Sequence, residues 1–386
     1  MLERDPDKRV VLLEGIRRES TLQPGERGAG HSMCSGGLGQ AMVGAIGWPM
    51  PREVRMAEIH RILFETPSRS FEVSDELLGI EGPLGVVTNR KRFDDWLLSK
   101  ALKLGAHYEQ RARVTLTARD RSGAQPVWRL TTQDGRAFAA RSLVGADGPE
   151  SRIAAEHLGA PPVRDEDMYL GTEVYVRSSQ FPRDAIMVRF QTSRLLGYYW
   201  AFQGGQVIKV GCGSSRSSGV QVSRENDWWR ERLSAVWGDE GFLARPLEHV
   251  GGRITCSPPL VKVADAAGQV AIVGEAARAV LASAGAGDAY AVETGRALGR
   301  ALALGDLSLY QKWWGRSVRP LMKRHYRFKR ILMGLSDDEM DRLIGTLSHF
   351  RPRTSNIRRE VPRAFAYLLR KQPLLVGRVA VRAALA

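Results

Sequence analysis

The segment from 270 to 303 constrains the fold more than any other part of the chain. It begins with the apolar run VAIV, turns at Gly274, continues through a loop of small residues and ends in a helical pattern. A strand, a glycine turn and a helix in this order are typical of a βα unit in a nucleotide-binding sheet. The segment therefore predicts an α/β domain with a parallel sheet.

A second buried strand is predicted near the start of the chain, where Val10 to Leu13 are followed by Glu14. In dinucleotide-binding domains the second strand ends in an acid that hydrogen-bonds the ribose, about 20 residues after a glycine-rich turn. Only thirteen residues precede Glu14. We therefore expect a Rossmann-like sheet without its first βα unit, through either a start assigned too far downstream or a gene that has lost its beginning.

The middle of the chain changes from helical to alternating patterns. Residues 90 to 104 place apolar side chains at helical spacing and predict an amphipathic helix that ends at Gly105. Residues 111 to 146 and 168 to 213 alternate between apolar and polar positions, with turn pairs such as DG between the runs. They predict antiparallel sheets and a second, β-rich lobe. From 307 the pattern is helical and strongly basic.

The composition limits the partners and the compartment. The formal net charge is +15, which a coding bias toward arginine would explain as well as a basic surface for anionic lipid, acidic substrate or nucleic acid. No signature of nucleic-acid binding is present, so nucleic acid is the least supported of these partners. Cys34, Cys212 and Cys256 are too far apart for a metal motif or a disulfide framework, which favours a reducing, cytoplasmic compartment. The sequence contains no uninterrupted run of about 18 apolar residues, so no membrane-spanning helix is predicted.

Several motifs occur in a fixed order along the chain. They are MCSGGLG at 33–39, which closes a loop rich in Gly and Ser from 20 to 40; Arg90 with Phe93 and Asp94; LVGADGPESR at 143–152; GYYWAFQ at 197–203; IVGEAA at 272–277; and SAGAGDA at 283–289. Together they resemble the FAD-dependent geranylgeranyl reductases, a branch of the flavoprotein superfamily that includes the aromatic hydroxylases. The resemblance covers residues 8 to 330.

The resemblance implies a set of residues that bind FAD. They are Glu14, Gly36, Gly37, Arg90, Asp147, Gly148, Gly274, Glu275, Gly285 and Gly287. Glycines allow the backbone to approach a planar ring, and helix amino ends favour anionic groups. Cys34 is a candidate neighbour of the flavin, although a lone cysteine is more often simply packed. The chain departs from the family pattern at Ser35, which replaces a glycine, at Glu275, which replaces an aspartate, and at Ala286 and Asp288.

Tyr198, Trp200 and Phe202 recur at every second position, which places them on one face of a strand. They are similar to the reductases' Tyr-x-Trp-x-Phe-Pro motif, with Gln203 in place of the proline. The resemblance implies a wall that encloses an isoprenoid chain beside the flavin. An aromatic core stripe is the alternative interpretation. No proton donor can be named from the sequence.

The function that the resemblance implies is the reduction of carbon–carbon double bonds in a geranylgeranyl or other polyprenyl lipid. FAD would be reduced by NAD(P)H or another external donor, and the basic tail would suit peripheral docking on anionic lipid. Two alternatives stay open. One is a quinone-linked flavoprotein dehydrogenase or an FAD-dependent monooxygenase, and the other is a flavin-free remnant that binds lipid or a partner protein.

The expected organisation is a discontinuous FAD-binding domain with an inserted lobe. The FAD-binding domain would comprise 1–110, 140–160 and 265–305, the antiparallel substrate lobe 161–264, and the helical region 306–386. Since the glycine turn and the first helix bind the diphosphate in such domains, we expect weak or absent FAD in the chain as given. The predicted class is a mixed α/β oxidoreductase with no metal site.

Overall fold

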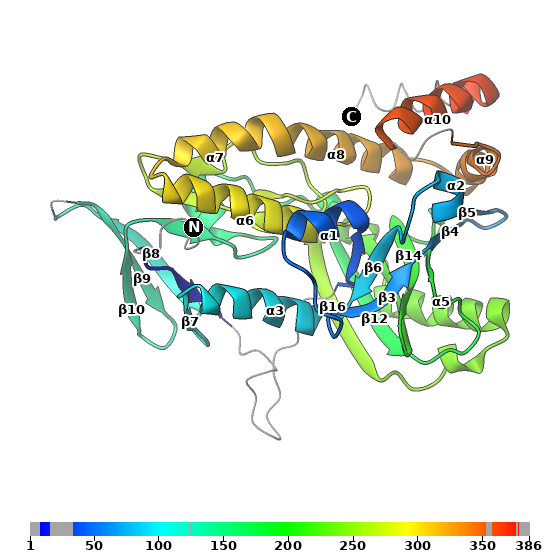
Figure 1. Ribbon diagram of the computed structural model, residues 1–386. Helices are drawn as coiled ribbons and strands as arrows, with labels where there is room; N and C mark the ends of the chain where they lie inside the picture. The colour runs from blue at the N-terminus through cyan, green and yellow to red at the C-terminus, as the bar shows by residue number, and fades with distance from the viewer. Residues whose placement is uncertain (1–7, 16–33, 124, 353–356, 376, 378–386) are drawn as a thin grey trace.

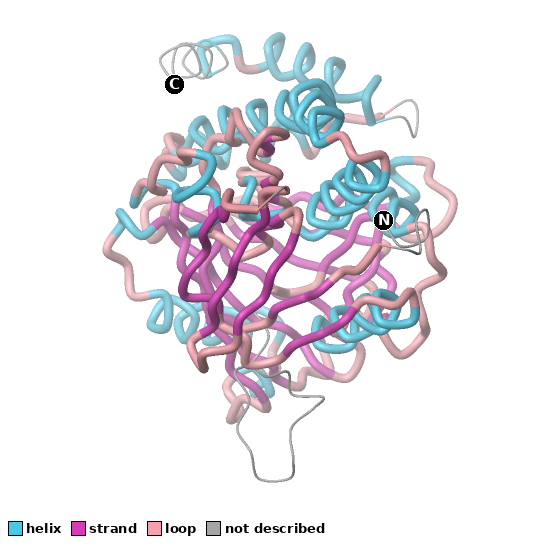
Figure 2. Tube along the Cα trace, turned by 90° about the vertical axis from the view of Figure 1, so that its left-hand side faces the viewer, coloured by secondary structure: helices cyan, strands magenta, loops and turns pink. Residues whose placement is uncertain are grey.

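The computed structural model describes residues 8–15, 34–123, 125–352, 357–375 and 377, and all structural statements below concern these residues. Figure 1 shows several sheets with long helices packed along one side of them, and Figure 2 shows the strands gathered in the middle of the molecule. The predicted mixed α/β architecture is confirmed. Of the predicted loop from 20 to 40, the part up to residue 33 lies outside the described residues.

A seven-stranded sheet is the largest layer. Its strands, in spatial order, are β16 (Glu248–Thr255), β12 (Met168–Val176), β15 (Val207–Ser215), β14 (Gly197–Gly204), β13 (Ala185–Arg189), β4 (Arg61–Glu65) and β5 (Ser70–Ser74). Neighbouring strands are antiparallel except β13 and β4, which are parallel. The antiparallel sheet predicted over 168 to 213 is confirmed. The sheet also takes β4 and β5 from the range 1–110.

Helix α5 (Val222–Trp237) covers one face of this sheet. Tyr199 and Ala201 of β14 are fully buried against it, and the indole of Trp229 donates a hydrogen bond to the carbonyl of Trp200 at 2.8 Å. Successive side chains of a strand point to opposite faces. Tyr198, Trp200 and Phe202 therefore share the face turned away from α5.

Four smaller sheets complete the strand layers. They are β2 (Gly37–Gly39), β6 (Gly85–Thr88) and β3 (Arg55–Ile59); β1 (Val11–Leu13) with β7 (His107–Glu109); β11 (Leu143–Gly145), β18 (Val270–Ile272) and β17 (Ala264–Asp265); and β10 (Ala137–Ala140), β9 (Val127–Thr132) and β8 (Val114–Asp120). The pairs β1–β7 and β11–β18 are parallel, as the βα pattern predicts. The expected loss of a first βα unit stays a prediction.

Four described α-helices lie in the first half of the chain, and each follows a strand. They are α1 (Gln40–Ile46), α2 (Asp75–Leu78), α3 (Arg90–Lys103) and α4 (Arg152–Leu158). The helix predicted over 90 to 104 is α3. It begins after Asn89, whose side chain accepts a hydrogen bond from the Arg92 amide at 3.2 Å, and it buries Phe93 and Trp96. The helix ends before Gly105, which adopts a positive φ of 90°.

The predicted helical tail is confirmed over the described residues. It comprises α7 (Leu307–Trp313), α8 (Arg319–Met333), α9 (Asp337–Leu347) and α10 (Ile357–Lys371), and α7 packs beside α6 (Asp288–Ala303) along the top of the molecule in Figure 1. The side chain of Lys329 on α8 forms a buried ion pair with Asp167 at 2.7 Å, which ties α8 to the start of β12. No described helix is long and apolar enough to cross a membrane.

Candidate functional site

The predicted aromatic wall exists as one face of β14. Trp200 is buried, and its ring centroid lies 5.7 Å from that of Tyr198, which in turn lies 6.0 Å from that of Phe190. Tyr198 donates a hydrogen bond from its hydroxyl to the carbonyl of Ala284 at 2.7 Å. The wall is therefore tied to the small-residue loop that precedes α6.

Two glycines of β15 give the Trp200 ring its position. Gly211 lies directly opposite Trp200 in the sheet register, and a Cβ on Gly211 would fall 2.4 Å from Cζ2 of the indole. Gly213, opposite Tyr198, has more space, since its Cβ would lie 3.6 Å from the ring. The indole thus lies flat over the backbone of β15. The Gly-x-Gly spacing in VGCG was the signal for this arrangement that the sequence interpretation missed.

Two loops that contain glycines pack against the aromatic side chains of the wall. A Cβ on Gly37 would lie 2.9 Å from the Phe202 ring, and one on Gly285 would lie 3.2 Å from the Tyr198 hydroxyl oxygen. Gly36, at φ 74°, packs so closely on Thr88 that a side chain there would meet the Thr88 carbonyl. The structure therefore brings together Gly36, Gly37, Gly285 and the three aromatics.

Cys34, Arg90, Asp94 and Asp288 form a polar cluster beside these loops. Arg90, at the start of α3, pairs with Asp288, at the start of α6, and with Asp94 at 3.0 Å. The thiol of Cys34 donates to Asp288 at 3.3 Å. Burial raises the pKa of Cys34 to about 12, and the Asp288 carboxylate adds to the rise. Cys34 is thus a protonated thiol at neutral pH.

A buried acid and a buried lysine on the wall face were not predicted from the sequence. Glu173 of β12 lies opposite Gly211 and accepts a hydrogen bond from the Trp200 indole at 2.7 Å. Lys209 of β15 donates to the carbonyls of Ser35 and Thr88, both at 2.9 Å. Burial raises the pKa of Glu173 and lowers that of Lys209, because each charged form loses its hydration.

The turn after β18 carries Gly274 and Glu275. Gly274 adopts φ 58°, donates its amide to the Thr294 hydroxyl at 2.9 Å, and lets α6 approach at Ala291. The carboxylate of Glu275 accepts a hydrogen bond from the amide of Thr255 at 2.6 Å. This turn therefore joins α6 to the end of β16.

Two predicted residues lie at other strand ends. Glu14 follows β1, and its backbone hydrogen-bonds to Glu109 and Ala112. Asp147 follows β11, and its carboxylate accepts from the Ser151 hydroxyl at 2.5 Å and from the Ile153 amide at 3.3 Å. Asp147 thus stabilises the start of α4 in this structure, beside Gly148 with its φ of 81°.

No protein-family model matches the chain. Two similar curated proteins are both named as reductases of the same lipid. Digeranylgeranylglycerophospholipid reductase 1 of Methanopyrus kandleri is 30% identical over 251 residues, which cover 63% of this chain and 62% of that protein, under two thirds of its length. Digeranylgeranylglycerophospholipid reductase of Methanoculleus marisnigri is 25% identical over 335 residues, 82% of this chain and 80% of that protein.

Solved structures share the fold. A geranylgeranyl bacteriochlorophyll reductase-like protein from Thermoplasma acidophilum has a TM-score of 0.77 at 18% identity, over 96% of this chain and 92% of that chain. The predicted resemblance to the geranylgeranyl reductase family is confirmed by these relatives and by the shared fold. A probable FAD-dependent monooxygenase from Pseudomonas aeruginosa has a TM-score of 0.65 at 18% identity, over 89% of this chain and 94% of that one. The predicted enzyme class is confirmed, since the curated relatives are named reductases and the structural matches include FAD-dependent enzymes.

The residues of this chain fit a bound FAD. Helix α6 begins at Gly287 with no side-chain cap, so its first amides are open to an acceptor. The Nε of Arg90 is buried and has no hydrogen-bond partner among the described residues. Gly37 and Gly285 present backbone without side chains to the wall. Open amides, a buried guanidinium and bare backbone are the groups that hold an anionic, planar cofactor.

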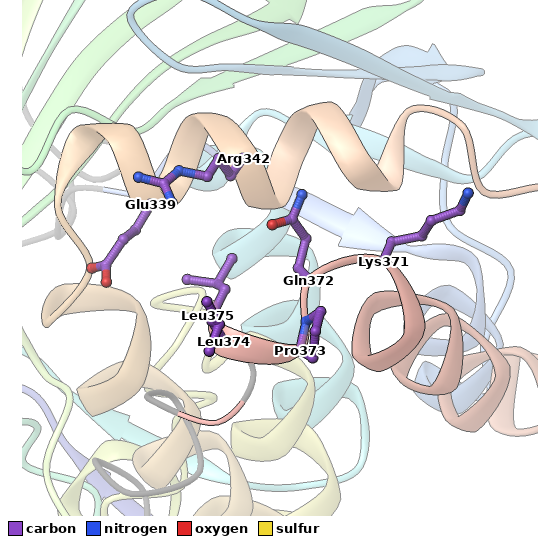
Figure 3. A pocket seen from close by; sticks show the side chains of 7 residues that line it. All are labelled: Glu339, Arg342, Lys371, Gln372, Pro373, Leu374 and Leu375. Carbon is purple, nitrogen blue, oxygen red and sulfur yellow. The ribbon is translucent and has the colours of Figure 1, made fainter.

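A surface pocket of this chain lies elsewhere, between α9 and the end of α10 (Figure 3). It is lined by Glu339, Arg342, Lys371, Gln372, Pro373, Leu374 and Leu375. None of these seven residues belongs to the predicted site. We therefore assign no part of the flavin or substrate site to it.

Glu275 should make the stability of this chain depend on pH. Burial raises the pKa of its carboxyl to about 7, and the nearby Asp288 adds to the rise. The folded chain then holds a proton that the unfolded chain releases above about pH 4.5, so stability falls as the pH rises toward 7. Glu275→Gln should reduce this loss by about 2 kcal/mol in urea unfolding at about pH 5 and about pH 8. An unchanged loss would show that Glu275 is ionised throughout; Glu156→Gln, at an exposed helix position, is the control.

Proposed function

We propose that this chain is an FAD-dependent reductase that adds hydride and a proton across carbon–carbon double bonds of a prenyl lipid. The observation that carries the proposal is the opposition of two glycine loops to an aromatic wall, with Gly37 against Phe202 and Gly285 against Tyr198. A planar cofactor needs the bare backbone, and an apolar chain needs the aromatic face. The curated relatives, named as reductases of digeranylgeranylglycerophospholipid, support the substrate class.

Different residues would hold different parts of FAD. Arg90 and the first amides of α6 suit negative groups. The resemblance assigns Gly36, Gly37, Gly285 and Gly287 to the cofactor as well, and Gly37 and Gly285 lie against the wall. Glu14, Asp147, Gly148, Gly274 and Glu275 stand at strand ends of the parallel sheets, where cofactors bind in such folds. When bound, FAD supplies the hydride donor, which an external reductant such as NAD(P)H would regenerate.

The wall would orient the prenyl chain and exclude water. Tyr198, Trp200 and Phe202 present one continuous face, and hydrogen bonds of Tyr198 and Trp200 fix two of the rings. Cys34, with its protonated thiol, adds a small group to the loop that faces this wall. A dry, rigid surface limits the approaches that an alkene can take, which favours one geometry of attack.

Replacement of Trp200 by alanine tests the role of the wall. We expect Trp200→Ala to lower turnover of a digeranylgeranylglycerol lipid by about a hundredfold, because a large apolar contact is lost, and to lower the rate of flavin reduction by less than about threefold. Stopped-flow absorbance of the flavin and mass spectrometry of the lipid measure the two steps. Trp237→Ala, in a ring contact with Phe181 below the other face of the sheet, is the matched control. Equal loss in both steps would contradict the proposed role.

A monooxygenase or quinone-linked activity is the second candidate, and the structural similarity to a probable FAD-dependent monooxygenase favours it. Aerobic incubation of the reduced protein with prenyl lipid separates the two activities, since a reductase yields a product heavier by two hydrogens per bond and a monooxygenase one heavier by oxygen. Purified protein without flavin absorbance, and without gain of it on titration with FAD, would instead indicate the flavin-free remnant.

We also propose peripheral membrane docking on the cytoplasmic side through the end of the chain. Arg370 and Lys371 are exposed near Leu369 and Leu374, which are 49% and 78% exposed. Reversal of Arg370 and Lys371 to glutamate should weaken flotation with anionic vesicles at least tenfold, since each basic residue near such a surface contributes about 1 kcal/mol. Reversal of Arg129, on β9, and Arg141, directly after β10, is the control. Flotation that shows no preference for anionic over neutral lipid would contradict docking.

A further inference from the structure

Ser35 forms hydrogen bonds with two buried side chains, one acidic and one basic. Its hydroxyl donates to a carboxylate oxygen of Glu173 at 2.5 Å, and its carbonyl accepts from the ammonium of Lys209 at 2.9 Å. The two partners lie 138 and 174 positions away in the sequence. One residue of the Cys34 loop is therefore fixed to two strands of the large sheet, β12 and β15.

Glu173 and Lys209 are completely buried, each with 0% of its surface exposed. Lys209 also donates to the carbonyl of Thr88, whose amide and hydroxyl both donate to the carbonyl of Gly36. A buried charge retains its place only when hydrogen bonds and opposite charge offset the loss of hydration. The loop is thus held at two successive residues by bonds that are costly to break.

The same carboxylate also holds the wall. The oxygen of Glu173 that accepts from Ser35 accepts from the Trp200 indole as well, while the second oxygen has no hydrogen-bond partner among the described residues. An unpaired buried oxygen is destabilising, and residues that break this rule are concentrated at functional sites. A single side chain therefore joins the Cys34 loop to the centre of the aromatic wall.

We propose that Glu173 is a positioning residue, which with Lys209 and Ser35 forms a clamp that fixes the distance between the Cys34 loop and the Trp200 wall. The clamp accounts for Ser35, where the chain departs from the family's glycine, because a glycine has no side chain that could donate to Glu173. Its consequence for turnover rests on the proposed function, since the loop and the wall would then enclose the flavin and the prenyl chain.

The position of the loop can be measured in the full chain without added flavin. Cys34 is partly exposed, whereas Cys212 and Cys256 are buried, so N-ethylmaleimide labels Cys34 first. We expect Ser35→Ala to raise the labelling rate by about tenfold to a hundredfold, because it removes a hydrogen bond to a charged group. Ser35→Thr keeps the hydroxyl and should restore the rate. Ser99→Ala, which removes a hydroxyl bonded to its own helix, should change nothing, and Cys34→Ala gives the background.

The coupling between the two residues separates a clamp from general destabilisation. Glu173→Gln should also raise the labelling rate, because a neutral amide oxygen is a weaker acceptor than a carboxylate. The double variant with Ser35→Ala should label no faster than the faster single variant, since both weaken one interaction. Effects that multiply, or a rate that follows the free energy of unfolding across all variants, would overturn the clamp.

Activity gives the second readout. In the presence of FAD, Ser35→Ala should lower kcat for the prenyl lipid at least tenfold with little change in KM, because it alters alignment rather than binding. A wild-type chain that reduces no prenyl lipid while the labelling rates behave as expected would contradict the proposed function and leave the clamp standing. Unchanged labelling together with normal turnover would contradict the clamp alone.

Discussion

Replacing Asp167 with asparagine is expected to lower the free energy of unfolding by about 3–5 kcal/mol. Asp167 and Lys329 have side-chain exposures of 1% and 6%, and their ion pair is 2.7 Å long. Lys329 also donates to the carbonyl of Cys256 at 3.0 Å, so the ammonium cannot move to water without leaving that bond as well. The substitution leaves a buried positive charge without its counter-charge. Urea unfolding followed by circular dichroism measures the change.

An exposed pair in the same turn provides the control. Asp165, two residues earlier, pairs with Arg216 at 2.5 Å, and the two side chains are 67% and 37% exposed. Asp165→Asn should cost less than about 1 kcal/mol, since water and salt screen such pairs. The combined replacement of Asp167 by leucine and Lys329 by methionine should cost less than Asp167→Asn alone, because no charge then stays buried. Equal losses for Asp167→Asn and Asp165→Asn would show that burial does not strengthen this pair.

Gly211→Ala should have the next largest effect on the fold and should disable the wall. The new methyl group would lie 2.4 Å from the Trp200 ring and 2.6 Å from the Thr172 carbonyl, so the ring must leave its place. Overpacking of this kind costs about 1–3 kcal/mol. Displacement of the indole also breaks its hydrogen bond to Glu173. We therefore expect prenyl turnover to fall by about a hundredfold in protein that remains folded. Urea unfolding measures the change in the free energy of unfolding.

Gly213→Ala is the matched substitution on the same strand. Its methyl group would lie 3.5 Å from the Leu170 carbonyl and 3.6 Å from the Trp200 ring, which is ordinary van der Waals contact. Gly213→Ala should therefore lower the free energy of unfolding by less than about 1 kcal/mol, because alanine in place of glycine is tolerated in a strand. Similar losses for the two variants would contradict the argument from the indole's position.

Local patterns of the sequence predicted the elements that depend on neighbours in the chain. The helix α3, the hairpins of β8 to β10 and the common face of Tyr198, Trp200 and Phe202 follow from periods of 3.6 and two residues. Glu173 and Lys209 could not be found in this way, because their roles depend on which strands pair and in which register. The pattern also showed Ser35 as a departure from the family, but its partner lies 138 residues away.

Asp147 and Arg90 show the same limit at single residues. The motif around Asp147 identified a turn correctly, yet both carboxylate oxygens bond within that turn, to Ser151 and Ile153. Arg90 was expected to face a cofactor, and the structure adds Asp288 as its neighbour across 198 positions. A motif reports which residue types occur together, whereas the charge that each one meets is set by the tertiary fold.

The parallel pairing of β4 with β13 has a consequence for how the molecule can be divided and how it folds. Residues 61–65 lie beside residues 185–189, so the large sheet is complete only when segments more than 100 positions apart have met. Pairing over such distances slows folding, because the chain entropy is lost before the contacts form. A fragment of residues 161–264 would expose β13 as an unpaired edge, and such edges recruit other chains. If residues 161–264 were produced as a separate fragment, we therefore expect the fragment to associate with other chains.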